Sequence, residues 1–134
     1  MADQAPFDVV IPPGQERSYE RFHFAPAVRT GNTIHVSGVI GVGADGRVPE
    51  DAAEEFTSAF TQVAATLEAA GATLDHIVEM TTFHVDMSST LGTFIAAKDA
   101  AITEPYPAWT AIGCTELALP GGRAEVKVTA VVDD

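Results

Sequence analysis

The stretch from Pro105 to Val132, PYPAWTAIGCTELALPGGRAEVKVTAVV, decides how the rest of the chain is interpreted. It predicts two strands joined by a Leu-Pro-Gly-Gly turn, because glycine and proline favour turns and the flanking residues favour strands. The first strand carries Trp109, and the second carries Glu125 beside alternating apolar residues. A small-molecule site at these residues therefore depends on how the two strands lie together.

The length and composition predict a single domain over residues 1–134, in which residues 1–15 form a loosely ordered or edge-strand start. The chain contains no apolar run of about 20 residues, which argues against a membrane span. We find no charged segment followed by an apolar one at the start, as an export signal would require. Cys114 is the single cysteine. These features favour a protein of the reducing cytoplasm.

The charge balance is strongly acidic. Nineteen Asp and Glu residues outnumber seven Lys and Arg residues, and the formal net charge is -12. The basic residues are scattered along the sequence, and such a surface repels phosphate backbones. We therefore do not expect a nucleic-acid partner.

The residue pattern outside this stretch predicts further strands and two helices. In chain order these are an edge strand over 7–11, a strand over 33–39, a helix from Asp51 to Gly71, a strand over 77–85 and a helix over about 90–101. The first helix carries an apolar stripe that must pack on something flat, most simply a sheet. We expect an α+β domain in which both helices cover one face of a mixed sheet. The other face also carries apolar residues, and we expect it to meet a partner chain.

Short pieces spread over nearly the whole chain together resemble the RidA family, also called YjgF or endoribonuclease L-PSP. These pieces are Ala27-Val28, Gly31-Asn32, Val36-Ser37-Gly38 with Ile40, Leu67 to Ala72, Thr82-Phe83, Asp86-Met87, Pro107-Ala108 and Glu125-Val126. The resemblance implies a chorismate-mutase-like fold and a homotrimer with clefts between neighbouring subunits. It also implies hydrolysis of reactive imines and enamines without a metal or cofactor.

The resemblance implies a set of site residues, and this chain matches only some of them. In typical members a glutamate of the last strand positions the attacking water, and it matches Glu125; the backbone near a Ser-Gly pair completes the pocket, and the pair matches Ser37 and Gly38. Typical members also grip the substrate carboxylate with an arginine after the Pro-Ala pair. At four positions this chain has an apolar or aromatic residue where the family has a polar one: Trp109 at the arginine, Phe24 at a tyrosine, Phe94 on the second helix and Val39 after Ser-Gly.

These residues support a first hypothesis, a RidA-like hydrolase with an altered, apolar pocket. It would act on a small imine, enamine or related planar compound without a carboxylate at the usual place, because indole cannot neutralise an anion. Glu125 would be catalytic, handling protons and water. The predicted substrate-binding residues are Trp109, Phe24, Phe94, Ser37, Gly38, Val39, Ala108, Thr110 and Ala111.

Several alternatives remain open from the sequence. The protein could instead be a trimer that binds an aromatic metabolite and does no chemistry. Trp109 could anchor the trimer interface, and Glu125 could belong to an ordinary solvated strand face with Lys127 and Thr129. His84 and Asp86, two residues apart, could hold a metal only with His35, and we expect none. The ribonuclease activity in the family's name conflicts with the acidic charge balance.

Overall fold

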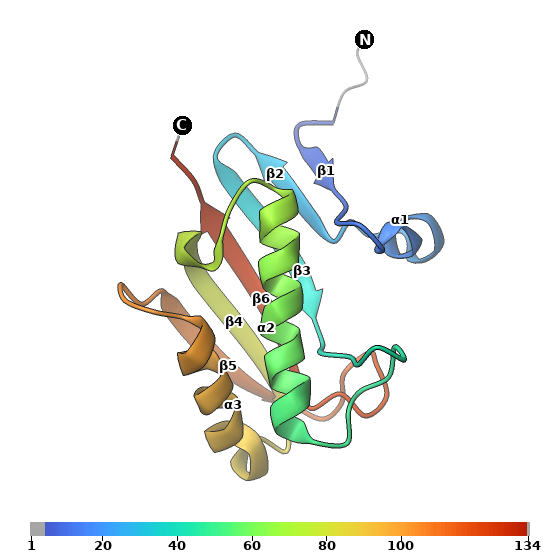
Figure 1. The fold of residues 1–134 in the computed structure, drawn as a ribbon, viewed down its shortest axis with the longest axis vertical. Coiled ribbons are helices and arrows are strands. Elements are labelled where there is room, and N and C mark those ends of the chain that lie inside the picture. Colours follow the sequence, from blue (N-terminus) through green and yellow to red (C-terminus); the bar gives the residue numbers. More distant parts are fainter. Residues whose placement is uncertain (1–4, 134) are drawn as a thin grey trace.

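The computed structural model describes residues 5–133, which form a six-stranded sheet with two long helices packed side by side on one face (Figure 1). The strand order is β1-β2-β3-β6-β4-β5. The elements are β1 (Asp8–Val10), α1 (Glu16–Phe22), β2 (Ala27–Thr30), β3 (Thr33–Val39), α2 (Ala52–Ala69), η1 (Leu74–His76), β4 (Ile77–Val85), α3 (Met87–Ala101), β5 (Ala108–Cys114) and β6 (Ala124–Val131).

The sheet is mixed, as the sequence predicts. Its neighbouring strands are antiparallel except for β4 and β5, which run parallel and are connected by α3. The two closing strands, β5 and β6, are not neighbours, because β4 lies between them and pairs with both. This corrects the expectation that they lie together. The helical connection places β5 outside β4, at the sheet edge, and β6 returns to pair between β3 and β4.

Helix α2 follows the predicted limits closely. Its N-cap Asp51 accepts a hydrogen bond from the backbone N–H of Glu54. Its apolar stripe is buried against the sheet: Phe56, Phe60, Val63 and Leu67 are each 3% exposed or less. Gly71 adopts a φ of 89°, a left-handed conformation in which a side chain would be strained, and the helix ends there.

The side chains of strand β6 alternate between the two faces of the sheet. Its buried residues Ala124, Val126, Val128 and Ala130 face the helices and form part of the core. The residues between them, including Glu125 and Lys127, point to the opposite face because successive side chains of a strand alternate. The sequence pattern of β6 therefore places Glu125 on the face that the long helices do not cover.

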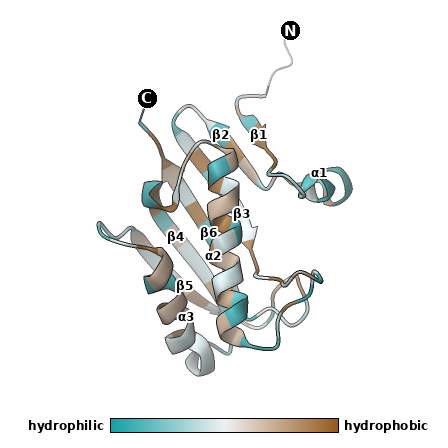
Figure 2. Ribbon diagram, in the orientation of Figure 1, coloured by the Kyte–Doolittle hydropathy of each residue, from teal (hydrophilic) through white to brown (hydrophobic). Residues whose placement is uncertain are grey.

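Helix α1 was not predicted. None of its seven residues is buried, and it extends from one edge of the molecule as a mostly hydrophilic segment (Figures 1 and 2). A helix with no buried stripe leaves no apolar period in the sequence. It ends at His23, which adopts a left-handed conformation with a φ of 62°. This turn leads the chain to Phe24 and into β2.

Candidate functional site

Glu125 lies directly against Gly38 on the face of the sheet opposite the helices. The pairing of β3 with β6 shifts register between Val36 and Val39, so that β3 has one extra residue there. Such a bulge changes the direction of the strand and of its side chains. A Cβ atom at Gly38 would overlap the carboxylate of Glu125. Glycine at this position therefore makes room for the acid.

Ser37 holds the bulge to the chain that precedes β2. Its hydroxyl donates a hydrogen bond of 2.7 Å to the carbonyl of Ala25, and its backbone N–H donates one of 2.9 Å to the carbonyl of Pro26. The backbone at Ser37 is expected from the sequence to contact a ligand, and its N–H group is already paired within the chain. The same contacts fix the segment that carries Phe24.

An open cavity of about 570 Å³ lies beside Glu125. Strand β2 pairs with β3 only as far as Val36, so the end of β3 is a free edge, and the cavity follows it. Five of the predicted site residues line this cavity together: Phe24, Ser37, Gly38, Val39 and Glu125. The sequence thus identified much of one wall of the cavity.

Other residues of this cavity were missed by sequence reasoning. They come from α1, from α2 and from the segment before β6, and include Phe22, Gln62 and Leu119. The α1 residues gave no signal because that helix has no apolar period. Gln62 and Leu119 join the cavity through tertiary packing, which no local pattern encodes.

Trp109 lies on the other face of the sheet. Its indole Nε1 donates a hydrogen bond of 2.9 Å to Oγ1 of Thr82, and its ring stacks on Phe94 with centroids 6.2 Å apart. The ammonium of Lys98 lies 5.0 Å from the centre of the indole. Within one chain, Trp109 therefore packs between a core ring and a lysine of α3.

The structure of one chain does not bring Trp109 and Glu125 together. Trp109 pairs with Met80, a core residue on the helix side, whereas Glu125 pairs with Phe83 on the opposite side. A hollow shared by the two side chains would require a second chain. Phe94 is 0% exposed, so within this chain it has no surface to offer a ligand.

The remaining predicted residues, Ala108, Thr110 and Ala111, lie on β5 and are exposed. Because β5 is an edge strand, one side of its backbone has no partner strand among the residues that the structure describes. These residues do not line the cavity of Glu125. They form a separate surface at the other edge of the sheet.

His84 is a buried core residue. It is 0% exposed, its Nε2 lies 2.7 Å from Oγ1 of Thr82, and its ring meets Phe94 edge-on. Burial lowers the pKa of His84 below the ordinary value of 6.5, because the charged form loses its hydration. His84 is therefore a hydrogen-bonded residue of the sheet. Within residues 5–133, no three His, Cys, Asp or Glu side chains gather as metal ligands would.

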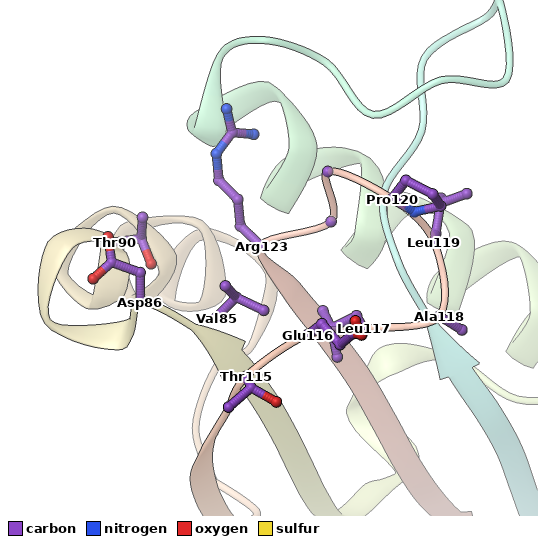
Figure 3. A pocket seen from close by; sticks show the side chains of 12 residues that line it. Val85, Asp86, Thr90, Thr115, Glu116, Leu117, Ala118, Leu119, Pro120 and Arg123 are labelled. Atoms are coloured by element: carbon purple, nitrogen blue, oxygen red, sulfur yellow. The ribbon is translucent and has the colours of Figure 1, made fainter.

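A second open cavity, of about 730 Å³, lies at the end of β4 (Figure 3). Ala118 and Leu119 line both cavities, so the segment before β6 separates them. Arg123 of this cavity already forms an ion pair of 2.7 Å with Glu55 and donates to two backbone carbonyls. The larger cavity therefore lacks an uncompensated cation, and it does not contain Glu125.

The chain matches a known protein family over most of its length. Residues 15–132 match the profile of the endoribonuclease L-PSP family, and the chain belongs to this family, the RidA/YjgF family. None of the helices in the described part of the chain combines the length and the apolar character that crossing a membrane requires.

Individual relatives support the same assignment. The chain is 36% identical over 126 residues to the RutC family protein YjgH of Escherichia coli, covering 93% of this chain and 95% of the relative. It is 30% identical over 115 residues to a 2-iminobutanoate/2-iminopropanoate deaminase of Dermatophagoides farinae, covering 82% and 86%.

Solved structures agree with the fold. The structure of protein YjgH superposes with a TM-score of 0.87 at 34% identity, covering 97% of this chain and 99% of that one. Rv2704 from Mycobacterium tuberculosis, of the YjgF/YER057c/UK114 family, superposes with a TM-score of 0.79 at 25% identity, covering 92% and 98%. The α+β domain with a mixed sheet is therefore the fold of this family.

Proposed function

We propose that this protein is a hydrolase of the deaminase type that acts on a small imine or enamine in an apolar cavity. One observation carries the proposal: the carboxylate of Glu125 lies over Gly38 and lines an open cavity of about 570 Å³. A relative at 30% identity is named a 2-iminobutanoate/2-iminopropanoate deaminase, which supports the reaction class. The proposed substrate lacks a carboxylate at the position that typical members grip with arginine.

Imine hydrolysis requires few catalytic groups from the protein. The carbon of an imine is electrophilic, so a positioned water and one acid–base group can suffice. Glu125 would accept a proton from the water as the water oxygen bonds to the imine carbon and the C=N electron pair moves to the nitrogen. Glu125 would then return that proton to the nitrogen. The resulting carbinolamine then loses its amine as the C–N bond breaks, leaving a carbonyl. No residue other than Glu125 is required to transfer protons in this scheme.

We propose that the working form is a homotrimer whose clefts lie between subunits. The exposed Ile112 of β5 and Val131 of β6 support it, since they leave apolar surface at the uncovered face of the sheet. A neighbouring copy that covered this face would bring its β5 close to the cavity of Glu125. In that arrangement the exposed β5 residues of one chain on this face, such as Thr110, would lie beside the Glu125 cavity of the next chain.

Two imines test the proposed reaction. One is 2-iminopropionate, generated in situ by an amino-acid oxidase and followed by ammonia release. The other is N-benzylidenemethylamine, which has no carboxylate and is followed by formation of benzaldehyde. We expect the protein to accelerate hydrolysis of the second more than that of the first, and Glu125→Gln to remove the acceleration. If neither imine is hydrolysed faster than in buffer, the hydrolase proposal fails.

The aromatic residues of the cavity favour one other candidate, a trimer that binds a small aromatic metabolite without reaction. Phe22 and Phe24 are 64% and 47% exposed and line the cavity, so they offer ring faces to a ligand. This candidate predicts saturable binding that survives Glu125→Gln. The hydrolase proposal predicts lost turnover in the same variant.

A further inference from the structure

The cavity beside Glu125 has an unusual distribution of charge. Among the described residues that line it, Glu125 is the one charged side chain, and no lysine, arginine or histidine is present. The larger part of the lining is apolar, from residues such as Phe22, Phe24, Val39, Ile40 and Leu119. A lone carboxylate thus faces a mostly apolar space.

No described residue of the same chain pairs with this carboxylate. Within residues 5–133, no hydrogen bond or ion pair involves the side chain of Glu125. Lys127 lies two residues further along the same face of β6, but it is exposed and does not line the cavity. This contrasts with Glu55, a fully buried acid, which pairs with Arg123. The charge of Glu125 is therefore available to a ligand.

We infer that this site binds a small organic cation, either a primary ammonium or a protonated imine, on an apolar carbon skeleton. The inference rests on the proposed function, because it concerns the same cavity and names the class of its substrate. A cationic N–H group donates a charge-assisted hydrogen bond to a carboxylate, which is stronger than a neutral one. The exposed rings of Phe22 and Phe24 attract cations through their faces.

The net charge of the whole chain also favours a cationic ligand. With a formal net charge of -12, the molecule attracts cations and repels anions over distances comparable to the Debye length. A substrate carboxylate placed in this cavity would instead face Glu125 with no cation among the described lining residues to balance it. Protonation also makes an imine carbon more electrophilic, so the bound form is the reactive form. The substrate is thus a cationic imine without a carboxylate.

Three ligands of the same shape and different charge test this inference without any turnover. They are benzylammonium, benzyl alcohol and benzoate, and their binding to the purified protein is measured by calorimetry at low and moderate salt. We expect benzylammonium to bind at least about tenfold more tightly than benzyl alcohol, and benzoate most weakly. Glu125→Gln should remove that preference and leave the binding of benzyl alcohol unchanged.

The matched control is Glu116→Gln, which removes an acid from the neighbouring cavity and alters the net charge equally. It should retain the preference for benzylammonium, which separates a local contact from the overall field. Benzoate binding as tightly as benzylammonium, or an undiminished preference in Glu125→Gln, would overturn the inference. Binding of benzylammonium by a protein that hydrolyses no imine would leave this inference standing and refute the hydrolase. Imine turnover without a binding preference for benzylammonium would refute this inference and leave the hydrolase proposal standing.

Discussion

At the scale of the residue, the contact between Gly38 and Glu125 is the most sensitive point of the site. Gly38→Ala would place a methyl group where the carboxylate lies, so the flexible acid must turn away. We expect turnover and the preference for benzylammonium to fall at least about tenfold, because a charge-assisted hydrogen bond is lost. The thermal midpoint should change little, since the displaced atoms are the end of a flexible side chain.

Gly92→Ala is the matched control for that substitution. A Cβ atom at Gly92 meets nothing within 4 Å, and the residue lies inside α3. Alanine favours helix over glycine by about 1 kcal/mol, so this variant should be slightly more stable and fully active. Unchanged activity in Gly38→Ala would show that the position of the carboxylate does not matter.

His84 makes the stability of the protein depend on pH. Because burial lowers its pKa in the folded state below 6.5, the unfolded chain binds the proton more tightly. The contribution of His84 is fully present above the unfolded pKa and is lost as the pH falls from about 6.5 towards the folded pKa, by up to about 1.4 kcal/mol per pH unit.

Chemical denaturation at about pH 7.5 and about pH 5.5, one unit either side of the ordinary histidine pKa, measures this loss. We expect His84→Asn to lose less unfolding free energy between the two pH values than the natural protein does. The exposed His35 serves as the control position, and His35→Asn should keep the full dependence. Identical pH dependence in all three proteins would contradict the role of His84.

The sequence predicted the places of the candidate site residues in the fold only in part, for a physical reason. Alternation along β6 was enough to place Glu125 on the uncovered face, because one face of that strand is plainly apolar. Phe94 was assigned to the pocket from its place in the resemblance, yet it packs against Phe56 and His84 in the core. The face that a residue such as Trp109 takes depends on which strand it pairs with, and that is a non-local property.

At the scale of the element, an ion pair fixes the start of β6 to α2. The carboxylate of Glu55 is fully buried and accepts hydrogen bonds of 2.7 Å from the guanidinium and from the backbone N–H of Arg123. Arg123→Ala would leave that charge buried with no cation beside it. We expect a loss of about 3 kcal/mol in unfolding free energy, measured by chemical denaturation.

Arg17→Ala is the control for Arg123→Ala. Arg17 lies on α1, is exposed and forms no ion pair with any described residue, so its removal should change the unfolding free energy by less than about 0.5 kcal/mol. An equal effect of the two substitutions would mean that the ion pair with Glu55 does not stabilise the start of β6.

The elements with a strong local period were predicted well, and their arrangement was not. Helix α2 and strand β4 were found nearly residue for residue, since an apolar stripe and a β-rich run are local signals. The place of β6 between β3 and β4 depends on pairing between distant segments. Helix α1 was missed because its seven residues bury nothing.

At the scale of the whole molecule, the uncovered face of the sheet predicts self-association. Ile112 is 41% exposed on β5, and we expect an apolar residue there to lie between subunits. Sedimentation equilibrium should give three times the chain mass of 14.0 kDa. Ile112→Asp should lower that mass, whereas Thr61→Asp, on the exposed side of α2, should not. A natural protein that sediments as a monomer would contradict the proposed clefts.

The proposed chemistry depends on a single acid, Glu125. The most direct measurement is the initial rate of N-benzylidenemethylamine hydrolysis by equal amounts of the natural protein and Glu125→Gln, both shown by melting to be folded. We predict that the natural protein accelerates the reaction and that the variant is at least about 100-fold slower, as expected for loss of a general acid–base group. Equal rates in the two proteins would contradict the role of Glu125.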